Sequence, residues 1–117
     1  MSIRDALNRL RTSTDELDRR RRAERRAASG CIPIDEVADR QFVDLFGEVR
    51  SVRIVPRAGA PALDVTIDDG HGVALATFYG RRSIPGVHAG RMLKVTGRCS
   101  LRTGRATLIN PEYQLVD

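Results

Sequence analysis

The first 28 residues of the chain carry an apolar stripe with the spacing of a helix. Segment 2–28 contains no proline or glycine, and its mostly apolar positions recur at steps of four and three: Ile3, Leu7, Leu10, Thr14 and Leu17. This spacing places side chains on one helical face. Ser13-Thr14-Asp15-Glu16 has the order of a capping box, so we expect that the helix can break near Thr12 and restart. Ser29-Gly30, followed by Pro33, predicts the end of the helix.

After the helix, alternating apolar and polar positions predict five strands, at about residues 41–55, 62–67, 73–79, 91–101 and 106–109. The first is long and has Gly47 in its middle, where we expect a bend or a bulge. The acidic, glycine-rich segment 68–72 predicts a hairpin turn between the second and third strands. Segment 80–90 has too many glycines and prolines for a strand. We expect a loop or short helical turn there, with Ile84 and Val87 turned inward.

Length and charge favour one domain with a basic extension. The chain has 117 residues, enough for one modest core, and we divide it into a helical extension, residues 1–30, and a β-barrel, residues 31–117. The formal net charge is +5, and residues 1–30 contribute +4 of it, from nine arginines and five acidic residues. All basic residues except Lys94 are arginine. Arginine binds phosphate through paired hydrogen bonds, which favours a nucleic-acid partner, although a GC-rich genome enriches arginine in the same way.

Six arginines lie within eight residues near the end of the predicted helix: Arg19, Arg20, Arg21, Arg22, Arg25 and Arg26. Acidic residues four positions earlier, such as Asp15 before Arg19, can keep this half helical without a core. We expect the block to stay in solvent. Two interpretations are open for it, a solvated helix face or linker and an electrostatic arm that binds phosphates or an acidic partner.

The five predicted strands, with a long first strand and a connector after the third, resemble the OB-fold, a partly open Greek-key barrel. Short motifs carry this resemblance over about residues 40–115: Gly47-Glu48-Val49, Asp69-Gly70-His71-Gly72, Phe78, Gly90-Arg91-Met92-Leu93-Lys94-Val95-Thr96-Gly97 and Asn110-Pro111-Glu112-Tyr113. The chain is similar in particular to the wedge domain of RecG-type branch-migration helicases and to small stand-alone OB-fold proteins of actinobacteria. The resemblance implies an all-β, five-stranded Greek-key barrel with an N-terminal α-helical extension. It also implies binding of single-stranded or branched DNA, or of RNA, without catalysis.

Two features depart from the family pattern. His71 stands in the turn where the family has a small hydroxyl residue. The chain also lacks the Gly-x-x-x-x-Gly-Lys-Ser/Thr phosphate loop of a helicase motor. The resemblance therefore implies binding but no strand-splitting activity.

The resemblance also implies where a ligand lies. OB-folds bind across the second and third strands, between the loop that joins strands one and two and the loop that joins strands four and five. Both loop regions are basic here, and we predict a nucleic-acid site made of these residues: Arg50, Arg53, Arg57, Tyr79, Arg81, Arg82, Arg98, Arg102 and Arg105. Aromatic residues are few, so phosphate contacts should dominate, with weak sequence specificity and strong salt dependence.

The two faces of the third strand follow from the match to the family strand. It turns Ala74, Ala76 and Phe78 inward and leaves four residues outward: Val73, Leu75, Thr77 and Tyr79. An apolar outer row needs a cover, which stacked bases, the helix stripe or a second subunit can provide. We favour contact between the stripe and this row, within one chain or between two. Phe42, Phe46 and Phe78 are assigned to the core, Tyr79 to stacking, and Tyr113 to packing at the barrel mouth.

The sequence shows no catalytic or metal-binding constellation. Cys31 and Cys99 are interpreted as buried or idle thiols, and His71 and His88 stand alone, so we expect no metal, no cofactor and no enzyme activity. No apolar run is long enough for a membrane span, and segment 1–5 leads into charge, so we predict a cytoplasmic protein. The alternative function is a protein-protein interaction module. In such a module, the helix and the outer row of the third strand form an interface with a partner or with a second copy of the chain.

Overall fold

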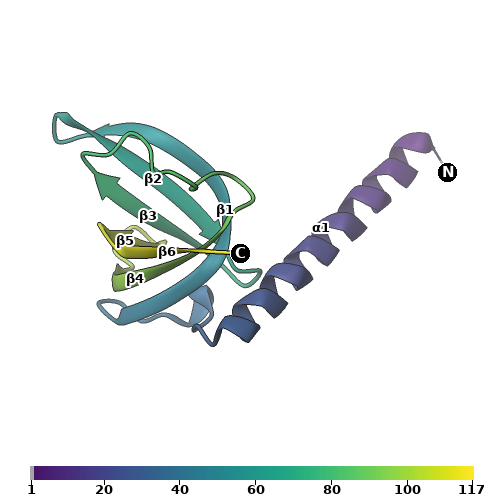
Figure 1. Ribbon diagram of the computed structural model, residues 1–117. Coiled ribbons are helices and arrows are strands. Elements are labelled where there is room, and N and C mark those ends of the chain that lie inside the picture. Colours follow the sequence, from purple (N-terminus) through teal and green to yellow (C-terminus); the bar gives the residue numbers. More distant parts are fainter. Residues whose placement is uncertain (1) are drawn as a thin grey trace.

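One helix and six β-strands make up the computed structural model, which describes residues 2–117 (Figure 1). In chain order the elements are α1 (Ile3–Ser29), a 3-10 turn (Ile34–Glu36), β1 (Phe42–Arg57), β2 (Ala60–Asp68), β3 (Val73–Tyr79), β4 (Met92–Ser100), β5 (Ala106–Ile109) and β6 (Glu112–Val116). The helix and the five predicted strands are confirmed, and the strand ends agree with the prediction to within two residues.

Strand pairing closes the first five strands into a ring. The order is β1-β2-β3-β5-β4, and β1 also pairs with β4. β3 and β5 run parallel, whereas the other paired strands are antiparallel. The protein is therefore a closed five-stranded barrel that follows an N-terminal helix.

A sixth strand was not expected. Pro111 ends β5, as predicted, but the chain turns at Asn110, which has a positive φ of 48°, and pairs again with β4 as β6. The ring of Tyr113 packs edge-on against Phe78, with centroids 5.7 Å apart. This contact confirms the packing role predicted for Tyr113.

β1 changes partner near its middle, since it pairs with β4 up to Glu48 and with β2 from Glu48 onward. A Cβ at Gly47 would lie 3.0 Å from the backbone of Asp68, so glycine permits this close approach. The register shift lies between Val49 and Ser51, three residues after the expected position at Gly47. The bulge therefore lies next to the point where β1 changes partner from β4 to β2, and Gly47 permits the close contact with β2.

The interior of the barrel is one continuous apolar core. Its most fully buried large side chains come from four different strands: Leu45, Leu63, Ile67, Leu93 and Leu108. Ile84 and Val87 of the β3–β4 connector are buried, as predicted. Ala74, Ala76 and Phe78 are also buried there, whereas Phe46 is buried in a second, smaller apolar cluster with Cys31 and Met92. The assignment of Phe42 to the core is wrong, because it is 64% exposed. Its neighbour Val43 points inward, so alternation turns Phe42 outward.

α1 is one continuous helix, capped by Ser2 at its start and by Gly30, with a φ of 76°, at its end. The break predicted near Thr12 is wrong. The hydroxyls of Thr12 and Thr14 donate hydrogen bonds to main-chain carbonyls one turn earlier, each at 2.9 Å. These side chains are satisfied inside the helix, so the capping-box sequence at residues 13–16 does not start a new one.

The turn between β2 and β3 is organised by Asp69, whose side chain is almost fully buried. One carboxylate oxygen accepts hydrogen bonds from the amides of His71 and Gly72, and the other accepts from the amide of Ile34, all at 2.8 Å. The hairpin is thereby tied to the 3-10 turn that follows α1.

α1 docks on this turn through its C-terminal half, and none of its residues is buried. A Cβ at Gly70 would collide with the carbonyl of Arg19 and lie 2.7 Å from the amide nitrogen of Ala23. Figure 1 shows the N-terminal half running away from the barrel. The apolar stripe therefore does not cover β3 within one chain, and its large members are exposed: Ile3, Leu7, Leu10 and Leu17. Contact between two chains stays a prediction.

Replacing Gly70 by alanine should release α1 from the barrel. The added Cβ meets the helix backbone, and the positive φ of 85° adds strain of about 1–2 kcal/mol. Gly80→Ala is the matched control, because Gly80 has a φ of 75° and open space where a Cβ would lie. Hydrogen-deuterium exchange over residues 19–29 should accelerate in Gly70→Ala and keep its wild-type rate in Gly80→Ala. Equal exchange in the two variants would contradict this docking contact.

Candidate functional site

The outer face of the barrel presents two rows of cross-strand neighbours. In the first row, register places Asp64 of β2 between Arg53 of β1 and Thr77 of β3, with Ile109 of β5 beyond Thr77. The second row is mostly hydroxyl side chains: Ser51, Thr66, Leu75, Thr107 and Ser100. β3 thus lies at the middle of a largely polar face.

Asp64 is the structural centre of this face. Its Oδ2 accepts a hydrogen bond from Nη2 of Arg57 at 2.6 Å, and its Oδ1 accepts one from the hydroxyl of Thr77 at 3.0 Å. The hydrogen bond and the charge of Asp64 raise the pKa of the Arg57 guanidinium above its ordinary value. Thr77 lies on the outer face, as predicted, but it is only 3% exposed. Asp64 and Thr77 therefore fix the face, and Arg57 neutralises its central carboxylate.

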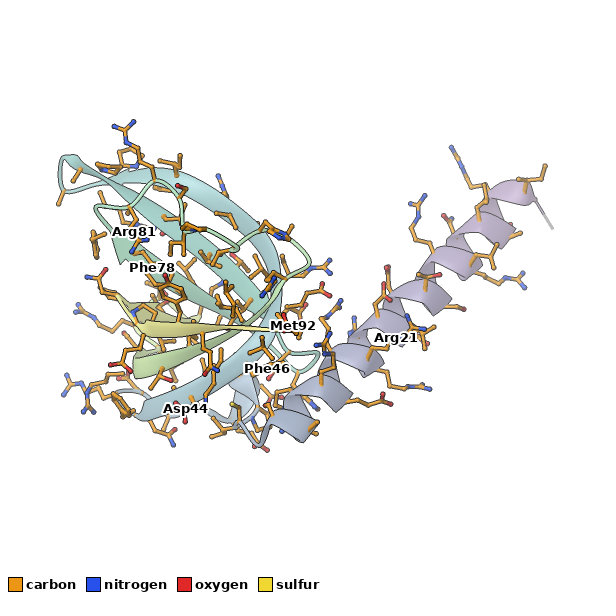
Figure 2. All side chains as sticks on the ribbon, viewed as in Figure 1. Arg21, Asp44, Phe46, Phe78, Arg81 and Met92 are labelled. Carbon is orange, nitrogen blue, oxygen red and sulfur yellow. The ribbon has the colours of Figure 1, made fainter. Side chains whose placement is uncertain are left out.

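Several predicted residues gather where β3 ends. Tyr79 pairs with Ala62 beside the β1–β2 turn, and Arg57 is the last residue of β1. The Tyr79 amide donates to the side chain of Asn110 at 2.8 Å, and Tyr79 is 41% exposed. Figure 2 labels Arg81 close to Phe78, at the start of the connector. The arginines at this end of β3 are Arg53, Arg57, Arg81 and Arg82.

A second group of arginines lies where β3 begins. Loop 101–105 leads into β5, whose Ala106 lies beside Ala74 of β3 in parallel register. Arg102 and Arg105 in this loop are exposed, and Arg105 borders a shallow hollow of about 320 Å³. From Ala74 to Tyr79, β3 extends about 17 Å at 3.3 Å per residue. The two arginine groups are therefore held apart by roughly the length of this strand.

Arg98 lies on another part of the ring. It pairs with Phe42 across β4 and β1, and its Nη1 donates to the carbonyl of Arg40 at 2.6 Å. Phe42 is exposed beside Arg98 and offers a ring face for stacking, a feature that we did not predict from the sequence. The sequence signal for this exposure is the alternation of Phe42 with the buried Val43 along β1.

Arg50 and Arg22 belong to the contact between α1 and the barrel, away from the β3 face. Arg50 Nη1 lies 3.1 Å from Glu48 Oε2, which also lies 3.8 Å from Nη1 of Arg22. Arg22 Nε lies 3.5 Å from Asp68 Oδ1. The expectation that the whole arginine block stays in solvent is wrong for Arg22, whose side chain is 11% exposed.

The other helix arginines differ in their contacts. Arg25 donates to a main-chain oxygen of Asp117 at 2.9 Å, and Arg26 donates to the carbonyl of Cys31 at 3.1 Å. Arg26 is partly buried, whereas the remaining members of the block are exposed: Arg19, Arg20, Arg21 and Arg25. The electrostatic arm stays a prediction for these exposed arginines.

In the part of the chain that the structure describes, the cysteines and His71 show no arrangement typical of a metal site or a reactive thiol. Across residues 2–117, no group of His, Cys, Asp or Glu side chains has the arrangement of metal ligands. Cys31 and Cys99 are buried, and burial raises the pKa of the Cys99 thiol, which keeps it protonated. His71 is exposed on its turn. Within the same range, no helix combines the length and the apolar character needed to cross a membrane.

The candidate site therefore consists of the outer face of β3 with an arginine group at each end. The structure brings Arg53, Arg57 and Tyr79 together, places Arg102 and Arg105 at the far end, and leaves Arg50 and Arg98 elsewhere. No protein-family model matches the chain, and no curated protein was found to match it.

Thr77→Val should destabilise the protein. Valine removes the hydrogen bond to the Asp64 carboxylate, and such a bond to a charged group contributes about 1.5–3 kcal/mol. Thr66→Val is the control, because Thr66 lies in the neighbouring row and is partly exposed, and it should change the free energy of unfolding by no more than about 0.5 kcal/mol. Urea unfolding measures both values. Equal stability of the two variants would show that the bond to Asp64 does not organise the face.

Proposed function

We propose that the chain is a non-enzymatic OB-fold protein that binds single-stranded or branched nucleic acid along β3, with little sequence specificity. The observation that carries this proposal is the placement of arginines at both ends of one strand face. The central carboxylate of that face, Asp64, is already paired with Arg57. The remaining arginines are therefore free to attract a polyanion.

The ring order β1-β2-β3-β5-β4 supports the OB-fold identity. In that fold, the face of the second and third strands and the loops between strands one and two and strands four and five bind oligonucleotides. The corresponding parts of this barrel carry Arg57 on one side and Arg102 and Arg105 on the other. The fold and the charge distribution thus favour the same face.

A nucleic-acid strand laid along β3 would meet three kinds of contact. Arg102 and Arg105 bind phosphates at one end, and Arg53 and Arg81 bind phosphates at the other. Hydroxyl side chains in between offer hydrogen bonds to sugar and phosphate oxygens. The exposed ring of Tyr79 accepts one stacked base, worth roughly 1–3 kcal/mol. Phosphate contacts dominate this arrangement. Because phosphates carry no sequence information, the sequence specificity of binding should be low.

Reversing the charge of both loop arginines should remove most of the binding. In a fluorescence-anisotropy titration with a labelled dT oligonucleotide, Arg102→Glu with Arg105→Glu should lose at least about tenfold in affinity, or about 1.4 kcal/mol. Arg4→Glu with Arg11→Glu is the control, because it changes the net charge equally on the projecting half of α1. The wild-type affinity should fall with salt at a slope near −0.7 per phosphate contacted. A salt-insensitive complex, or equal losses in the two double variants, would count against the proposal.

A protein-protein interaction module is the second candidate function. The observation that favours it is the exposed stripe on α1, where Ile3 is 81% and Leu10 is 65% exposed. Isolated helices shorter than about 12–15 residues are marginally stable in water. The projecting half of the 27-residue helix α1 therefore gains stability from any partner that covers its apolar face. A second copy of the chain is the simplest partner of this kind.

Leu7→Glu with Leu10→Glu tests this second candidate. If the stripe pairs with itself, the wild-type protein should sediment as a concentration-dependent oligomer and the variant as a monomer, because burying the introduced charges is unfavourable. Asn8→Glu with Thr12→Glu adds the same charge on another face of the helix and should leave the association unchanged. A wild-type protein that sediments as a monomer at every concentration would exclude self-association through the stripe.

A further inference from the structure

The junction between α1 and the barrel contains a cavity lined mainly by arginines. Its volume is about 250 Å³, and Met92 of β4 contributes to its wall. Figure 2 labels Arg21 on the helix and Met92 on the barrel. The charged residues that line the cavity are Asp18, Arg21, Arg22, Arg25, Glu48 and Arg50. Four guanidinium groups thus meet two carboxylates in the lining, and a third carboxylate, that of Asp68, lies 3.5 Å from Arg22. One positive charge is left in excess.

Arg22 lies in this cavity with unsatisfied hydrogen-bonding capacity. A guanidinium carries five N–H donors. The side chain of Arg22 is 11% exposed, yet its nearest carboxylate oxygens, on Asp68 and Glu48, lie 3.5 and 3.8 Å away. Its buried Nε has no hydrogen-bond partner. Unpaired buried donors are costly, so an anion with several acceptor oxygens would stabilise this site.

The neighbouring arginines are also only partly paired. Arg50 and Arg22 share the carboxylate of Glu48, so a single negative charge is paired with two guanidinium groups. Arg25 donates one hydrogen bond to a main-chain oxygen of Asp117. Arg21 is exposed and completes the lining. These contacts leave donors from two separate elements, α1 and β1, directed at one small volume.

We propose that this cavity binds one phosphate group, held between Arg21, Arg22 and Arg25 of the helix and Arg50 of β1. The planar fork of arginine matches phosphate oxygens through paired hydrogen bonds. Two sources supply this chemistry, a diester of a bound nucleic acid and a free phosphate. The first source rests on the proposed function, since α1 docks on the β2–β3 turn immediately before β3 begins. A strand that leaves this end of β3 would then continue onto the helix.

Phosphate in this cavity would also hold the helix on the barrel. Docking leaves no helix residue fully buried, although the Arg22 side chain is only 11% exposed. It depends on the close approach at Gly70 and on the ion pairs of Arg22. A ligand that contacts both α1 and β1 binds the docked state only. It therefore multiplies the equilibrium constant for docking by one plus the ratio of its free concentration to its Kd.

The first test titrates the full chain with inorganic phosphate and follows the NMR signal of the Arg22 Nε–Hε group. We expect a saturable shift in the wild-type protein, its loss in Arg21→Ala with Arg50→Ala, and its retention in Arg4→Ala with Arg11→Ala. The amide spectrum of each variant checks its fold, and Arg21→Ala alone gives the same comparison if the double variant unfolds. An Arg22 signal that does not shift, or shifts equally without Arg21 and Arg50, overturns the proposal.

A second titration, with a dT oligonucleotide, identifies the source of the phosphate. If the site takes a nucleic-acid diester, the oligonucleotide shifts the Arg22 signal, and Arg21→Ala with Arg50→Ala weakens binding about tenfold. The salt slope should then decrease in magnitude by about 0.7, for one phosphate lost. A shift with inorganic phosphate only assigns the site to free phosphate. An oligonucleotide that does not bind at all contradicts the proposed function, while the first titration still decides on the cavity.

Discussion

The arrangement of the candidate site depends on the pairing of β1 with two strands at once. β1 pairs with β4 over its first half and with β2 over its second half, and this pairing closes the ring. Closure in the order β1-β2-β3-β5-β4 puts the β1–β2 turn and the β4–β5 loop at opposite ends of β3. Gly47 permits it, because any larger residue would press on the backbone of Asp68. The separation of the arginine groups is therefore a property of the backbone.

Two different kinds of interaction hold the face and the helix in place. The face is fixed by Asp64, which binds Arg57 and Thr77 over a closely packed apolar core. α1 is attached mainly by ion pairs and by the contact at Gly70, and such partly exposed ion pairs weaken as salt screens them. Salt should therefore weaken the attachment of the helix more than it weakens the barrel. This difference makes the helix a separable arm of a fixed scaffold.

Local sequence signals predicted the elements whose formation is local. Alternation and the glycine-rich turn located β3 to the residue, and Gly30 located the end of α1. β6 was missed because it follows Pro111 and pairs with the first part of β4, away from Cys99 and Ser100, where β5 pairs. A capping-box sequence inside α1 was overridden by a continuous helix, since nothing there interrupts the main-chain hydrogen bonds.

The candidate site could be predicted only in part for the same reason. The strand order placed Arg57 beside the β1–β2 turn and Arg102 in the loop between β4 and β5, because these positions follow from the order of elements. The pairing of Arg57 with Asp64 depends on how its side chain lies across the face, and the burial of Arg22 depends on helix docking. Neither contact has a sequence pattern, because each joins residues through tertiary structure. Phe42 is the exception, since strict alternation with Val43 would have placed it outside.

Amide chemical-shift mapping of the isotope-labelled full chain with a single-stranded oligonucleotide tests the central claim most directly. The account predicts that the largest shifts follow β3, at Leu75 and Tyr79, and extend into residues 57–60 and 101–105. Shifts confined to the apolar stripe of α1, or spread evenly over the barrel, would contradict binding along this strand.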